Sequence, residues 1–107
     1  MIDPNKAIDF IFENGKNFAK AKAERIYLEE YRKSLKAILM KRSMETAIGA
    51  QEREAYAHEE YRKLLEGLRD AVEEEEELRW SLVAAQARVE VWRSQEASNR
   101  AEGKSFS

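Results

Sequence analysis

Apolar residues recur every three to four positions along the second half of the chain, from Tyr61 to Trp92. Only Glu75 places a charge in this series. A mean spacing of about 3.5 residues is typical of a helix that supercoils against another helix. A long helix cannot bury such a seam alone, so the pattern predicts a partner helix. The seam comprises Tyr61, Leu64, Leu68, Ala71, Glu75, Leu78, Leu82, Ala85, Val89 and Trp92.

The first half of the chain carries two apolar segments that do not share one helical face. Asp3-Pro4 is a typical helix start, because Asp caps the first turn and Pro fixes φ. Asn14-Gly15 is a typical stop. We therefore predict a short helix over about 4–13, a bend, and a long helix over about 17–43. The apolar stripe of the short helix comprises Ile8, Ile11 and Phe12. The apolar stripe of the long helix comprises Tyr27, Leu28, Tyr31, Leu35, Ile38 and Leu39.

The apolar period loses phase at 43–50, which predicts a turn that includes Gly49. A third helix is predicted over about 50–101, with an interruption near Tyr56–Glu59, and the tail 102–107 is expected to fray. The chain is thus predicted to be one all-α domain over 1–107. Its fold is a long antiparallel, coiled-coil-like helical hairpin with a short N-terminal helix, and we expect it to assemble into a bundle.

A second apolar stripe lies on roughly the opposite side of the third helix. A helix that is apolar on two sides is buried on two sides. The hairpin can cover one apolar side. The other apolar side predicts a homodimer or higher homo-oligomer. Alternatively, the short N-terminal helix covers that side. The predicted interface with a second copy or another partner comprises Trp80, Val83, Ala84, Ala87, Val91 and Trp92.

Glu73–Glu77 is a run of five acids that winds around more than one helical turn. Glu75 falls on the seam, where it can set the register as a buried residue paired with Lys or Arg of the facing helix. It could instead bind a metal. Carboxylate metal sites in helical bundles also use a Glu-x-x-His motif, which is absent, so we predict no metal site.

Charge is unevenly distributed along the chain. Residues 1–42 carry ten basic and six acidic residues, a net charge of +4, and residues 43–107 carry nine and fifteen, a net charge of −6. Either the two halves complement each other, or the basic half faces an anionic partner. A possible nucleic-acid face on the 17–43 helix comprises Lys22, Arg25, Arg32, Lys33 and Lys36.

Catalysis has little support in the sequence. The chain has no Cys and one His, and it lacks a nucleophile–base pair or a Gly-rich phosphate loop. We therefore predict that it is not an enzyme and needs no cofactor. No basic segment followed by an apolar run marks a signal peptide, and no apolar stretch approaches the ~20 residues of a membrane span. The expected location is the cytoplasm.

Several stretches resemble a family of small uncharacterised proteins of tailed bacteriophages and prophages. They include Tyr27–Ser34, Ala50–His58, Leu78–Trp80, Ala84–Arg88, Glu90–Arg93 and Glu96–Arg100. The resemblance covers most of the chain. It implies a phage origin, hence the host cytoplasm, and a gene neighbourhood of DNA metabolism. It implies no chemistry and no functional residues.

Together these observations predict a non-enzymatic phage accessory protein that acts by binding another protein. The expected setting is DNA replication, recombination or interference with host defence. One alternative is a nucleic-acid-binding module that uses the basic helix face. Another is a structural or assembly protein of the virion.

Overall fold

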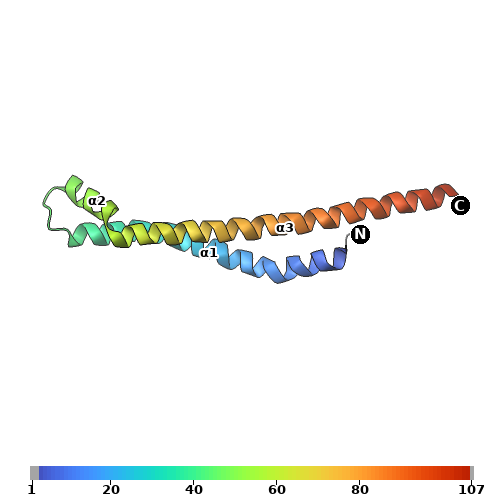
Figure 1. The fold of residues 1–107 in the computed structure, drawn as a ribbon, viewed down its shortest axis with the longest axis horizontal. Helices are drawn as coiled ribbons and strands as arrows, with labels where there is room; N and C mark the ends of the chain where they lie inside the picture. Colours follow the sequence, from blue (N-terminus) through green and yellow to red (C-terminus); the bar gives the residue numbers. More distant parts are fainter. Residues whose placement is uncertain (1–2, 107) are drawn as a thin grey trace. The chain divides into compact units, whose positions relative to one another are not determined.

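The computed structural model describes residues 3–106 of the chain, and the side chains of residues 3–104. Within that range it contains three helices: α1 (Pro4–Arg42), α2 (Ile48–Ala57) and α3 (Glu59–Phe106) (Figure 1). Helices α1 and α3 pack against each other as a hairpin, which confirms the predicted all-α hairpin. The chain divides into two compact units, one formed by 20–75 and one that combines 1–19 with 76–107.

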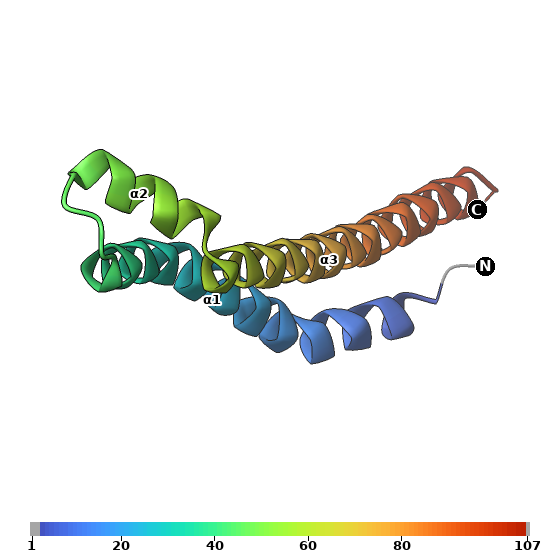
Figure 2. The same cartoon turned by 60° about the vertical axis from the view of Figure 1, so that its left-hand side comes forward.

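The unit formed by residues 20–75 has a hydrophobic core to which all three helices contribute. The core residues are Leu35 and Leu39 of α1, Ala55 of α2 and Tyr61 of α3, with Met40 and Leu64 packed against them. The rings of Tyr56 and Tyr61 meet edge to face, with their centroids 5.3 Å apart. Helix α2 therefore lies beside both long helices of this unit (Figure 2).

The interruption predicted near Tyr56–Glu59 is confirmed at His58. Its backbone is extended, with φ −67° and ψ 140°, and its Nδ1 accepts a hydrogen bond from the backbone N–H of Glu60 at 3.0 Å. A side chain that accepts a first-turn N–H acts as an N-cap. His58 thus ends α2 and caps α3. The predicted turn at 43–50 is shorter in the structure, because only residues 43–47 lie outside the helices.

The break predicted at Asn14-Gly15 is wrong, since α1 is continuous from Pro4 to Arg42. Asp3 does cap this helix, because its Oδ1 accepts the N–H of Asn5 at 2.9 Å. The Asn14 side chain donates to the carbonyl of Phe10, one turn earlier, at 3.0 Å. None of the described glycines has a positive φ, so Gly15 continues the helix instead of ending it.

A single seam explains why α1 continues without a break. Its positions alternate by three and four residues, and all of them are buried or half-buried: Ala7, Ile11, Asn14, Phe18, Ala21, Arg25, Leu28, Arg32, Leu35 and Leu39. Ile8 and Phe12, on which the two-helix prediction depended, are exposed, Phe12 to 80%. Small and polar residues hide this seam from a search for apolar residues alone.

The seam of α3 is confirmed by burial. Tyr61, Ala71, Glu75 and Ala85 are buried, and most of the positions between them are half-buried. The predicted helix end near 101 and the frayed tail are wrong for the described residues, because α3 continues to Phe106. No proline follows Ala101 to interrupt the backbone hydrogen bonds. Ser107 lies outside the described residues.

An ion pair links α1 to α2 within the 20–75 unit. Lys36 Nζ lies 2.8 Å from Glu52 Oε1 and 4.8 Å from the centroid of the Tyr56 ring. The hydrogen bond from Lys36 lowers the pKa of Glu52 below its ordinary value. The same bond and, to a smaller extent, a hydrogen bond with Tyr56 raise the pKa of Lys36. A lowered carboxyl pKa stabilises the fold above its ordinary pKa, and the contribution is lost as the pH falls.

Replacing Glu52 with glutamine should therefore lower the melting temperature by a few degrees near pH 7. We expect the difference from the wild type to shrink as the pH falls toward 3, because the wild-type carboxylate then becomes protonated. Thermal unfolding followed by circular dichroism at several pH values measures this. Glu66→Gln, at an exposed site on α3, is the matched control. A difference of the same size at pH 3 and pH 7 would contradict the role of the ion pair.

Candidate protein-interaction surface

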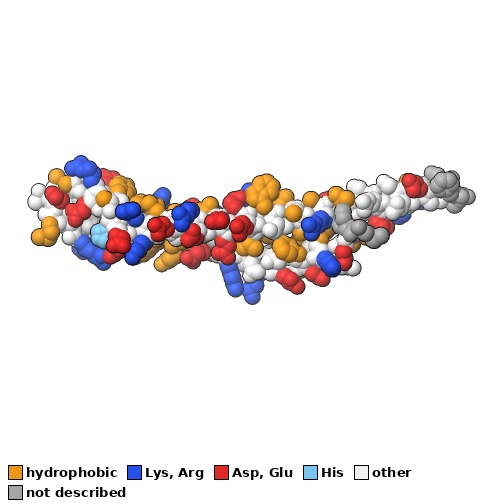
Figure 3. All heavy atoms as spheres, viewed as in Figure 1, with side chains coloured by type: hydrophobic (Ala, Val, Ile, Leu, Met, Phe, Trp, Pro, Cys, Tyr) orange, Lys and Arg blue, Asp and Glu red, His pale blue; other side chains and the backbone are white. Residues whose placement is uncertain are grey.

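Five predicted interface residues form a continuous apolar face on α3, which we call the outer stripe: Trp80, Val83, Ala84, Ala87 and Val91. At about 100° per residue, these positions lie on the side of α3 away from its seam. All five are exposed, Trp80 to 59%, Val91 to 45% and Val83 to 40%. Figure 3 shows hydrophobic side chains at the surface along α3, between charged ones. Contiguous exposed apolar residues of this kind mark interaction sites.

The first turns of α1 cover a different side of α3 within the unit that combines 1–19 with 76–107. Ala7 and Ala85 are buried there, and both helices line a groove of about 710 Å³. The groove residues are Asp3, Lys6, Ala7, Phe10, Ser81, Ala84, Ala85 and Arg88. The N-terminal segment therefore reaches the second apolar face only at its edge, where Ala84 lines the groove, and it leaves Trp80, Val83 and Val91 exposed.

Trp92 differs from the other predicted interface residues. It occupies the last position of the α3 seam and is 36% exposed. On the helix it lies about 100° or more from Trp80, Val83, Ala87 and Val91 and about 80° from Ala84, at the edge of the outer stripe. The six predicted residues therefore form two surfaces: the outer stripe, and a partly exposed tryptophan at the end of the seam.

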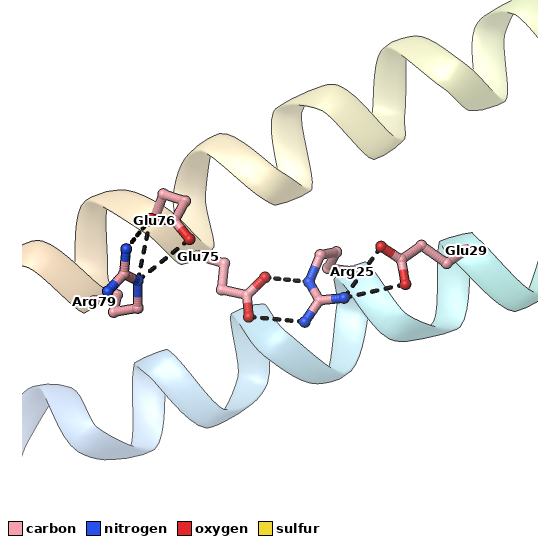
Figure 4. Close-up of polar contacts among 5 residues, drawn as sticks. All are labelled: Arg25, Glu29, Glu75, Glu76 and Arg79. Atoms are coloured by element: carbon pink, nitrogen blue, oxygen red, sulfur yellow. Dashed lines mark hydrogen bonds and ion pairs between the residues drawn. The ribbon is translucent and has the colours of Figure 1, made fainter.

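Charged side chains flank the outer stripe along both edges. The guanidinium carbon of Arg79 lies 4.6 Å from the centroid of the Trp80 ring, and Arg79 Nη2 lies 2.7 Å from Glu76 Oε2 (Figure 4). Arg79 and Glu90 occupy one edge, and the exposed Glu77 and Arg88 occupy the other. An apolar centre with a charged rim is the usual arrangement of a protein interface.

Glu75 is buried, with 7% of its surface exposed, and it pairs with Arg25 of α1. Arg25 approaches the carboxylate through Nε and Nη2, the latter 3.1 Å from Oε1. Arg25 Nη1 also lies 3.1 Å from both carboxylate oxygens of Glu29 (Figure 4). The hydrogen bond to Glu75 and, to a smaller extent, those to Glu29 raise the pKa of Arg25. The predicted buried acid met by a base of the facing helix is confirmed, and its role in setting the register stays a prediction.

The metal-binding interpretation of Glu75 gains no support from its surroundings. Among the described residues, no group of three or more His, Asp or Glu side chains is placed to hold a metal ion. The Glu75 carboxylate is bound on both oxygens by one guanidinium. Its geometry is that of a bidentate ion pair between helices.

The five residues of the predicted basic face do not form one solvent-facing surface. Arg25 points toward Glu75 and lies on the α1 seam, and Lys36 is engaged with Glu52. Lys33 is exposed and pairs with Glu30 at 3.3 Å. Arg32 is half-buried on the seam, and Lys22 is exposed. The Arg25–Glu75 and Lys36–Glu52 pairs agree with the alternative in which the two halves of the chain complement each other, because a helix seam can contain long cations as well as apolar residues.

Three of these cations line a groove with aromatic residues that no spacing in the sequence connects to them. The groove of about 650 Å³ is lined by Arg32, Lys33, Lys36, Ala37, Met40, Tyr56 and Tyr61. Tyr56 and Tyr61 come from α2 and the start of α3, so only the turn at 43–47 brings them beside α1. No local pattern in the sequence could have revealed this neighbourhood.

No protein-family model, curated protein or solved structure matches the chain. Within the described part of the chain, no helix combines the length and apolarity needed to cross a membrane.

Proposed function

We propose that this chain is a non-enzymatic protein-interaction module whose binding surface is the outer stripe of α3. The observation that carries the proposal is the exposure of Trp80 to 59%, with Val83 and Val91 exposed on the same side of the helix. Tryptophan is enriched among the residues that dominate binding energy at interfaces. The neighbouring alanines would let a partner helix approach closely.

The resemblance to phage proteins supports a setting in phage DNA replication, recombination or interference with host defence. A structural role in the virion would use the same surface. Nucleic-acid binding has less support, because Arg25 and Lys36 already bond carboxylates of the chain. We therefore favour a protein as the partner.

Replacing Trp80 and Val91 together with glutamine should abolish partner binding and leave the fold intact. The full chain, carrying an affinity tag, would be incubated with an untagged copy of itself and with a bacterial lysate. We expect the wild type to retain at least one protein that the double variant loses. Both sites are exposed, so circular dichroism should show little change in helicity or melting temperature.

Met44→Gln combined with Ile48→Gln is the matched control, because these residues are 95% and 72% exposed and belong to the unit formed by 20–75, which does not contain the outer stripe. The control should retain every protein that the wild type retains. If the wild type, the stripe variant and the control retain the same proteins, the outer stripe is not the binding surface and the proposed function is wrong.

A further inference from the structure

We infer that the outer stripe binds the same segment of a second copy of this chain, with the two α3 helices antiparallel and centred near Val83. The inference rests on the proposed function, because it names the partner of that same surface. Two features of the described residues point to this arrangement independently. One is the order of large and small side chains along the stripe, and the other is the order of the charges that flank it.

The sizes of the stripe residues favour an antiparallel pair. In such a pair, a residue before the centre faces a residue equally far beyond the centre on the other copy. Trp80 of one copy then faces Ala87 of the other, and Val83 lies beside Ala84. Trp80 of each copy thus meets a small residue of the other copy. The two helices can then approach closely without a clash between the two Trp80 indole rings.

The flanking charges favour the same centre. The twofold axis of an antiparallel pair brings each edge of the stripe against the same edge of the other copy. Glu77 precedes Arg88 on one edge, and Arg79 precedes Glu90 on the other. Each residue therefore faces an opposite charge on the second copy, while Arg79 and Glu90 also pair with Glu76 and Arg93 of their own helix. The midpoints of Glu77 with Arg88, Arg79 with Glu90, and Trp80 with Ala87 all fall between Leu82 and Ala85.

A parallel pair would have the opposite electrostatics. It would place the two Glu73–Glu77 runs side by side, and juxtaposed like charges are destabilising. In the antiparallel pair the two acidic runs instead lie at opposite ends of the contact, and Glu77 faces Arg88 of the second copy. The charge pattern therefore selects the orientation as well as the partner.

Cysteine cross-linking tests the orientation directly, because the native chain has no Cys. Two Ala84→Cys chains would meet near the axis and form a disulfide-linked dimer on oxidation. Two Ser94→Cys sites, on the same side of the helix, would be roughly 30 Å apart along the axis. A disulfide needs Cα atoms within about 7 Å. We expect Ala84→Cys to cross-link and Ser94→Cys not to, whereas a parallel pair would cross-link both.

Charge reversal tests the pairing in the otherwise native chain. Glu77→Lys and Arg88→Glu should each weaken self-association by about tenfold, because each places like charges opposite one another twice in the dimer. Mixing the two variants should restore association, since the side chain at position 77 of each chain would then face an opposite charge at position 88 of the other. Light scattering and sedimentation equilibrium measure the dissociation constants, and circular dichroism checks that each variant folds.

Three outcomes would overturn the inference: a wild-type monomer at tens of micromolar, efficient cross-linking of Ser94→Cys, or self-association that survives Trp80→Gln. The wild type could be a monomer and still capture a lysate protein that the variant with Trp80 and Val91 replaced does not capture. That result would overturn only the second copy as partner and would leave the proposed function standing. If the variant with Trp80 and Val91 replaced keeps both its self-association and the captured lysate proteins, the inference and the proposed function are both wrong.

Discussion

Replacing Arg25 with methionine is expected to lower the melting temperature by roughly 5–10 °C, because it leaves the Glu75 carboxylate buried without the cation that binds it. Glu75 is 7% exposed, and both of its oxygens accept hydrogen bonds from Arg25. Since about a quarter of the Arg25 side chain is exposed (24%), solvent screens part of the loss. Thermal unfolding by circular dichroism near pH 7 measures the change.

Replacing both partners separates the two roles of the pair. Arg25→Met with Glu75→Leu should recover most or all of the lost stability, because no buried charge then remains. The register prediction adds that the double variant should lose specificity, visible as a broader transition or a mixture of oligomers. Arg93→Met is the control, since Arg93 and Glu90 form an exposed pair (67% each) that should change stability little. Equal effects of Arg25→Met and Arg93→Met would show that the buried pair has no special role.

Replacing Leu39 with alanine is expected to reduce the free energy of unfolding by about 2–5 kcal/mol, the range for a leucine deleted from a packed core. Leu39 is 4% exposed and packs with Leu35, Ala55 and Tyr61, so the cavity would open where the three helices meet. Because small domains have only about 5–15 kcal/mol of stability, the loss would be a large fraction of the total. Urea unfolding followed by circular dichroism gives the free energy.

Ile38→Ala is the matched control for Leu39→Ala. Ile38 is the neighbouring residue on the same helix, yet it is 38% exposed, so we expect a loss of less than about 1 kcal/mol. The apolar pattern alone places both residues in one stripe. Equal losses at the two positions would mean that the core around Leu39 is not packed as the structure shows.

The seam of α3 could be predicted because its residues are adjacent in one helix and almost all apolar. The position of Glu75 on that seam predicted a basic partner on the facing helix, and Arg25 has that role. The partner's identity was not predictable, because it depends on the alignment of α1 with α3. The charge pattern left open whether Arg25 meets an anionic partner or the acidic half of the chain.

The course of α1 was mispredicted for a related reason. Its seam includes Ala7, Asn14 and Arg25, which are small, polar or charged, so the apolar residues alone suggested two helices with different faces. Asn14 and Gly15 are common at helix ends, but this preference is weak compared with the packing of a continuous seam. Tertiary packing therefore decided the continuity of the helix.

The sequence by itself determined the all-α hairpin, the interruption near His58 and the two apolar sides of α3, because all of these follow from the period of side chains along one helix. Only the tertiary structure decided which apolar side stays exposed, which cation meets Glu75, and which tyrosines join the basic residues of α1. Those outcomes depend on how residues far apart in the chain are aligned, and that alignment is set by packing between helices.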